Sequence, residues 1–183
     1  MTIKYFGLFV AAMTTATPLF AQTPPPPPPA EAKTSAMPYV MAAGMSDLYE
    51  INSSQIALQK SKTPAIRSFA KMLIKHHTMT TAATMKAAKK AGLTPPAPAL
   101  DAGATASITE LQSASAADFD RLYIGQQIPA HQAALDLHQS YAANGDKTPL
   151  RTSARAAMPI VKQHLTAATK LQHDVAMGPM KGM

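Results

Sequence analysis

Residues 64–91, PAIRSFAKMLIKHHTMTTAATMKAAKKA, have the clearest helical pattern in this chain. Its inward-facing positions recur in alternating steps of four and three, the periodicity of a helix that packs one face against its neighbours. These positions are Ile66, Ala70, Leu73, His77, Thr80, Thr84, Ala87 and Ala91. Pro64 suits the first turn of a helix, and Gly92 suits its end. The stretch therefore predicts one long amphipathic helix.

Further helices are predicted on both sides of this stretch. They cover about Pro38–Ser61, about Ala104–Gln112, about Ala116–Ala143 and Thr148–Val175. The last of these repeats the seam of four and three, whereas residues 93–103 contain three prolines and predict a non-helical connection. No segment shows the sustained alternation of a strand. We expect an all-α fold, an antiparallel four-helix bundle with a long connection between its second and third helices.

The beginning of the chain has the features of an export signal. Lys4 is followed by an apolar run, Tyr5 to Met13, and then by Pro18 and the small residue Ala21. We expect residues 1–21 to be a signal peptide and the mature chain to have no transmembrane segment, because no later stretch is long and apolar enough. This predicts an exported protein of the periplasm or the outer-membrane surface.

The remaining segments divide into a linker, a domain and a tail. Six consecutive prolines, Pro24 to Pro29, predict a stiff polyproline spacer within a linker of residues 22–36. The bundle domain is expected over residues 37–175. Residues 176–183 are expected to be a flexible tail that contains Met177, Met180 and Met183.

Composition restricts the chemistry. Cysteine is absent, so disulfides, thiolate metal sites and thiol nucleophiles are excluded, and no glycine-rich phosphate loop or serine elbow is present. The net charge of +7 is spread along the helices with only 5% aromatic residues, so we expect no specific nucleic-acid partner. The expected partner is a component of the cell envelope, and the sequence leaves the oligomeric state open.

Four polar residues are expected to lie at similar heights in the bundle. Glu50 is about 12 residues before the turn at Lys62, and His77 is about 14 after it, so antiparallel packing brings them level. Counting from the turn near Gly145 brings His131 and His164 to within little more than one helical turn of each other. Glu50, His77, His131 and His164 are therefore the candidate metal ligands, for copper, zinc or iron.

Two interpretations of these four residues remain open at this point. They form either a transition-metal site or a hydrogen-bonded core network that fixes the register of the helices. Asp120 and His138 are second-tier candidates, because they lie too far along their helix from His131 to share its centre. Met177, Met180 and Met183 are further second-tier candidates, since thioethers suit Cu(I). His76 is expected to be exposed.

The order of motifs resembles a ferritin-like bacterial family called domain of unknown function 4142, whose members are predicted envelope proteins. The resemblance covers about Tyr39 to Leu171 and is carried by Glu50-Ile51, Phe69-Ala70-Lys71-Met72 with His77, Phe119-Asp120 with Tyr123 and His131, and Pro159 with His164-Leu165. It implies a ferritin-like helical fold and an envelope location, without an established activity. Lys75-His76 replaces residues that are more often acidic in that family.

A carboxylate-bridged di-iron centre is excluded. Such centres take a glutamate from each of two helices and Glu-x-x-His from each of two others. This chain has only Glu31, Glu50 and Glu110, and neither of the last two has a histidine three residues later. We expect a noncatalytic envelope bundle that binds a metal or a partner through the Glu/His centre. The alternatives are a mononuclear metal-dependent redox protein and a structural or stress-related interaction protein.

Overall fold

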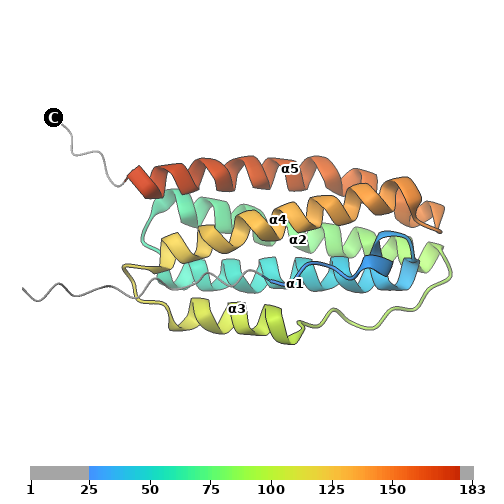
Figure 1. Cartoon of the computed structure of the whole chain (residues 1–183), viewed down its shortest axis with the longest axis horizontal. Helices are drawn as coiled ribbons and strands as arrows, with labels where there is room; N and C mark the ends of the chain where they lie inside the picture. Colours follow the sequence, from blue (N-terminus) through green and yellow to red (C-terminus); the bar gives the residue numbers. More distant parts are fainter. Residues whose placement is uncertain (1–24, 178–183) are drawn as a thin grey trace, which may run out of the picture.

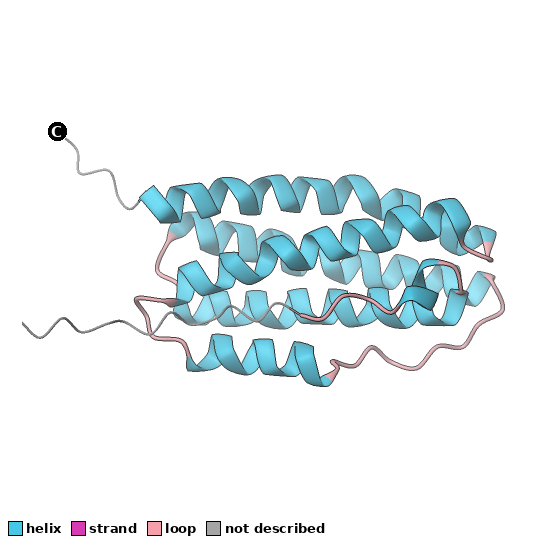
Figure 2. Cartoon of the chain, in the orientation of Figure 1, coloured by secondary structure: helices cyan, strands magenta, loops and turns pink. Residues whose placement is uncertain are grey.

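The computed structural model describes residues 25–177, with side chains placed as far as residue 175. The predicted signal peptide and most of the predicted tail lie outside the described residues. Within that range the chain is all helical, without a strand (Figure 2). A 3-10 helix, η1 (Ala30–Lys33), precedes the α-helices, which are α1 (Ala36–Lys60), α2 (Pro64–Lys90), α3 (Ala102–Ser113), α4 (Phe119–Asn144) and α5 (Thr148–Met177).

Four long helices lie side by side along the longest axis of the molecule (Figure 1). α1 packs against α2 and α4, and α5 packs against the same two helices. The shorter α3 lies along α1 and also contacts α4. None of the described helices combines the length and the apolar character that a bilayer span requires.

The helices begin and end close to their predicted bounds, and the largest difference has a local cause. α4 begins at Phe119 rather than near Ala116. The Ser115 hydroxyl donates to the Asp118 carboxylate at 2.7 Å, and the Asp118 N–H donates back to the Ser115 hydroxyl at 3.2 Å. These bonds hold residues 116–118 as a turn, because serine and aspartate side chains compete with helical backbone bonds.

The proline-rich segment leads directly into a short helix that packs against the domain. Pro29 has the extended backbone expected of a polyproline helix, with φ −63° and ψ 151°. Directly after it, η1 packs against α1 and α4, and Ala32 is completely buried. The expected linker of residues 22–36 therefore ends in packed structure, because the small Ala32 side chain fits between the two helices.

Two apolar clusters divide the interior along the helix axes. One contains Tyr49, Leu73, Tyr123 and Leu171, and the other contains Val40, Ala87, Leu137 and Leu150, to name one residue from each long helix. Along every long helix, the residues between these two groups include a buried polar or ionisable side chain. Those side chains are Asp47, His77, His131 and His164, and the buried Glu50 directly follows Tyr49 of the first cluster. The interior is thus an apolar core with a polar layer across its middle.

Candidate metal centre

Three histidines from three different helices meet in this polar layer. His77 lies on α2, His131 on α4 and His164 on α5, and all three are buried. Each histidine offers one ring nitrogen, and these three nitrogens all lie within 4.8 Å of one another. The centre is therefore held by three separate helices, whose packing fixes how far apart the imidazoles are.

Two of the histidines have one ring nitrogen occupied by the protein. His77 Nδ1 lies 2.7 Å from the Asp47 carboxylate, and His131 Nδ1 lies 2.8 Å from the backbone carbonyl of Gln127. Histidine ligands of metals almost always donate their other N–H to a carboxylate or a carbonyl, which fixes the tautomer. A neutral ring then has its lone pair on Nε2. His77 Nε2 is buried and has no hydrogen-bond partner among the described residues.

His164 links this centre to a fourth histidine. Its Nδ1 lies 3.3 Å from His131 Nε2, and its Nε2 lies 2.9 Å from His76 Nδ1. Because His131 Nε2 is an acceptor, His164 Nδ1 donates to it, and His164 Nε2 then accepts from His76 Nδ1. Moving the His164 proton from Nδ1 to Nε2 would free Nδ1 as a ligand atom while keeping the contact with His76, now with His164 donating.

The surroundings determine which of these rings are neutral. Burial lowers the pKa of His131 to about 3 and that of His164 to about 2, with the neighbouring His77 as the next cause in both cases. Burial also lowers the pKa of His77, but the hydrogen bond and charge of Asp47, with the charge of Glu50, outweigh it and leave that pKa above its ordinary value. His131 and His164 are thus free bases at neutral pH.

Glu50 places a carboxylate beside the histidines. Its Oε1 lies 3.7 Å from His131 Nδ1, which is within ion-pair range but is not a hydrogen bond. Both carboxylate oxygens are buried, and neither has a hydrogen-bond partner among the described residues. Burial raises the pKa of Glu50 to about 7, although the charge of His77 and the nearby Gln127 side-chain amide both act to lower it. A buried carboxylate without partners is costly, so its retention here requires an explanation.

These residues fit a transition-metal ion. Two nitrogens on a tetrahedral ion, with ligand bonds of about 2.0–2.1 Å, are roughly 3.4 Å apart. His131 Nε2 and His164 Nδ1 are 3.3 Å apart, and the unpartnered His77 Nε2 offers the third lone pair when that ring is neutral. Neutral imidazoles with one carboxylate suit copper, zinc or iron. The donor set thus has the chemistry and the burial that such an ion needs, and its His131–His164 pair has the spacing.

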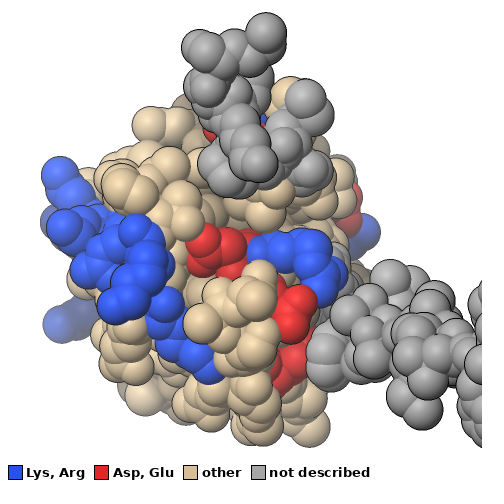
Figure 3. All heavy atoms as spheres, turned by 90° about the vertical axis from the view of Figure 1, so that its left-hand side faces the viewer, with Lys and Arg blue, Asp and Glu red and all other residues tan. Residues whose placement is uncertain are grey.

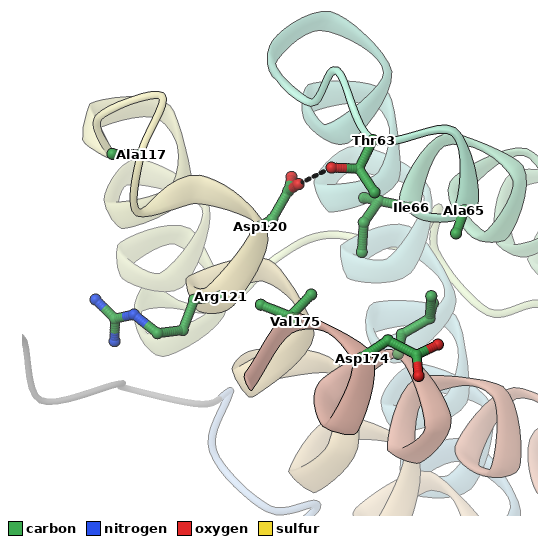
Figure 4. Close-up of a pocket in the computed structure, with 9 residues that line it drawn as sticks. Thr63, Ala65, Ile66, Ala117, Asp120, Arg121, Asp174 and Val175 are labelled. Atoms are coloured by element: carbon green, nitrogen blue, oxygen red, sulfur yellow. Dashed lines mark hydrogen bonds between the residues drawn. The ribbon is translucent and has the colours of Figure 1, made fainter. Parts of the chain in front are cut away.

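The second-tier candidates lie elsewhere. Asp120 accepts a hydrogen bond of 2.5 Å from the Thr63 hydroxyl and lines a surface pocket of about 550 Å³ (Figure 4). Figure 3 shows this end of the molecule, where acidic and basic side chains lie close together on the surface. His138 Nδ1 lies 3.0 Å from the Tyr39 hydroxyl, and neither Asp120 nor His138 belongs to the histidine group. The Met177 side chain, Met180 and Met183 lie outside the described residues.

Sequence reasoning missed two members of this network. Asp47 is 6% exposed and also accepts hydrogen bonds from the Thr80 and Thr81 hydroxyls. Its position, one helical turn before Glu50, was the signal that would have found it. The expectation that His76 is exposed was wrong: its ring is half-buried and stacks on His164, with centroids 5.1 Å apart. The close packing of α5 on α2 brings the two rings together.

Solved structures with the same fold are known. CopM in its Cu(I)-bound form has a TM-score of 0.64 and 18% sequence identity to this chain. CopM in its Cu(II)-bound form has 0.64 and 17%, and CopM in its Ag-bound form has 0.62 and 18%. Each match covers 76% of this chain and 96% of the CopM chain. At this identity the likeness shows the fold alone.

Sequence relationships place the chain in a family. No curated protein is significantly similar to it in sequence. The family model described as a domain of unknown function, DUF4142, matches residues 21–171. The match includes the Asp47, Glu50, His76, His77, His131 and His164 network. Because it extends over most of the sequence, this chain belongs to the DUF4142 family.

Proposed function

We propose that this protein binds a transition-metal ion, copper before zinc or iron, at His77, His131 and His164. The observation that carries the proposal is the meeting of three buried imidazoles whose ligand atoms lie within 4.8 Å of one another. Glu50 supplies a buried negative charge beside them, which would partly offset the charge of a bound cation. The activity is metal binding, and catalysis is not part of the proposal.

Unsatisfied atoms favour metal binding over a purely structural histidine core. A network kept for stability or interaction alone is expected to pair its buried polar atoms. Here His77 Nε2 and both Glu50 oxygens have no hydrogen-bond partner among the described residues. A mononuclear redox protein would use the same residues, and it differs from a binding protein by cycling the bound ion between oxidation states.

The structural neighbours support copper as the first ion to test. CopM, which shares the fold, has been solved with Cu(I), Cu(II) and Ag bound. Imidazole ligands accept copper in either oxidation state, and copper stands highest among the divalent first-row ions in affinity for nitrogen ligands. Both the donor set and the structural neighbours therefore support copper as the first ion to test.

We further propose that the four long helices form an antiparallel four-helix bundle of ferritin-like type. The short connection of residues 61–63 returns the chain between α1 and α2, and residues 145–147 do so between α4 and α5. We also propose export to the periplasm or the outer-membrane surface, with cleavage after Ala21. Mass spectrometry of protein recovered from the envelope tests the cleavage, since an unprocessed N-terminus would contradict it.

Elemental analysis of the mature protein, purified without a histidine tag, tests the metal site. We expect about one equivalent of copper after loading, and its loss in the His77→Ala, His164→Ala double variant. His173→Ala is the matched control, because that histidine is 74% exposed near the end of α5. If the wild type retains no copper, zinc or iron and the double variant is merely less stable, the histidines are a structural core. Redox cycling of the loaded protein then tests the alternative redox role.

A further inference from the structure

A line of soft donor atoms lies on the surface of α2, beside the buried centre. Met72, His76 and Met79 are spaced by four and three residues, so they lie on one face of the helix. Met72 and His76 are half-buried, whereas Met79 is 55% exposed and is one of two large apolar side chains that face solvent in the described chain. The line thus runs along the edge of the contact between α2 and α5.

The partners of this line are residues next to each other on α5. His76 Nδ1 lies 2.9 Å from His164 Nε2, and Met72 Sδ lies 3.9 Å from the amide nitrogen of Gln163. The contact between His76 and His164 uses His76 Nδ1, and no hydrogen bond of His76 Nε2 occurs among the described residues. A ring that donates from Nδ1 has its lone pair on Nε2, and the spacing places Met72 and Met79 on the same helix face, one turn to either side of His76.

We propose that Met72, His76 and Met79 form an outer site for a soft monovalent ion, Cu(I) or Ag(I). Thioether ligands select such ions, and imidazole also binds copper. This inference rests on the proposed function, because its place in the molecule is defined by the inner histidines. His164 joins the two sites, with one ring nitrogen facing His76 and the other facing His131.

The shared histidine makes the two sites antagonistic. An ion on His164 Nδ1 moves that ring's proton to Nε2, which then donates to His76 Nδ1. His76 can accept this bond only with its own proton on Nε2, the atom that the outer ion needs. An occupied inner centre therefore weakens the outer site, and an empty one leaves the outer site available.

Methionine methyl NMR tests the outer site directly. Ag(I) is titrated into the full mature protein labelled with 13C at the methionine methyl groups, and the Met72→Leu and Met79→Leu variants assign the two resonances. Met41 is the internal control, because it is 53% exposed but lies on α1, which has no histidine. The titration is repeated in the His77→Ala, His131→Ala variant, which removes inner ligands and keeps both His76 and His164.

We expect the Met72 and Met79 methyl resonances to shift in the inner-site variant with the first equivalent of Ag(I). In the wild type they should shift only after that equivalent, and the Met41 resonance should stay in place throughout. Shifts of Met72 and Met79 no larger than those of Met41, both in the folded variant and in the wild type at two or more equivalents, overturn the outer site. Should the variant fail to fold, as judged by circular dichroism, the wild-type titration decides by itself. If the wild type and a folded variant respond alike from the first equivalent, the inner metal site fails and the outer site stands.

Discussion

Replacing Glu50 by glutamine should stabilise the metal-free protein by an amount that depends on pH. Burial raises the pKa of Glu50 from 4.5 to about 7. The folded state therefore keeps a proton that the unfolded chain has lost between these two values. By linkage, stability falls wherever the folded state binds more protons than the unfolded state. The wild type therefore loses stability from near pH 4.5 to slightly above pH 7. The variant does not lose stability in this way, because glutamine does not titrate.

The magnitude follows from the shift. A difference of this size between folded and unfolded pKa values costs the wild type about 1 kcal/mol at pH 5, about 2 kcal/mol at pH 6 and about 3 kcal/mol at pH 8. Burying an amide in place of the carboxyl group adds an offset that does not vary with pH. The prediction therefore concerns how the stability difference between variant and wild type grows, and not its value at one pH.

Urea unfolding of metal-free wild type and Glu50→Gln between pH 4 and 8 measures this difference. Glu31→Gln is the matched control, because the Glu31 side chain is exposed. A difference for Glu50→Gln that does not grow with pH would refute the reasoning, since Glu50 would then titrate alike in both states. We also expect the variant to bind copper more weakly, so that one substitution raises stability and lowers affinity, the usual trade-off at a functional site.

Three further predictions concern other contacts in the described structure. Asp47→Asn should destabilise the fold by about 3 kcal/mol at pH 6, because it breaks the buried pair with His77. The raised pKa of His77 contributes stability that is complete below its unfolded value of 6.5 and is lost as pH rises through the folded value, so the effect should shrink at higher pH. Urea unfolding measures it beside Asp136→Asn, whose carboxylate is 58% exposed, and a larger effect at pH 9 than at pH 6 would contradict it. Gly145→Ala should cost about 1–3 kcal/mol in thermal unfolding, since the new Cβ would lie 2.5 Å from the Tyr141 ring. Gly92→Ala is the control: no atom lies within 4 Å of the new Cβ, so only the positive φ of 79° should lower the stability, by about 1 kcal/mol. Equal losses above about 2 kcal/mol at both positions would argue against a clash with Tyr141 as the reason. Tyr39→Phe should lower the unfolding free energy by about 1–2 kcal/mol, because His138 Nδ1 would lose its 3.0 Å partner, and an unchanged midpoint would mean that water replaces it.

The helices were predictable because their signals are local. The spacing along residues 64–91 and the proline and glycine at its ends depend only on residues near one another in the chain, and α2 occupies Pro64–Lys90. The start of α4 was misplaced because a side-chain turn at Ser115 and Asp118 competes with the helix at the same local level.

The level of the polar layer was also predictable, but its contacts were not. A constant rise of 1.5 Å per residue brings residues at equal distances from a turn to equal heights, which places the histidines together. That count cannot tell which of Asp47 and Glu50, one turn apart on α1, receives the hydrogen bond from His77. The structure gives it to Asp47 and leaves Glu50 without one.

The α-helices, their approximate ends and the height at which the ionisable residues meet were readable from the order of residues, because these depend on local periodicity and on the fixed rise of a helix. The stacking of His76 on His164 depended on tertiary packing, because His76 lies about 100° around the helix from His77. The rotation of each helix about its axis is set by side chains packed from its neighbours. No pattern within α2 alone contains that information, because α5 supplies the contact.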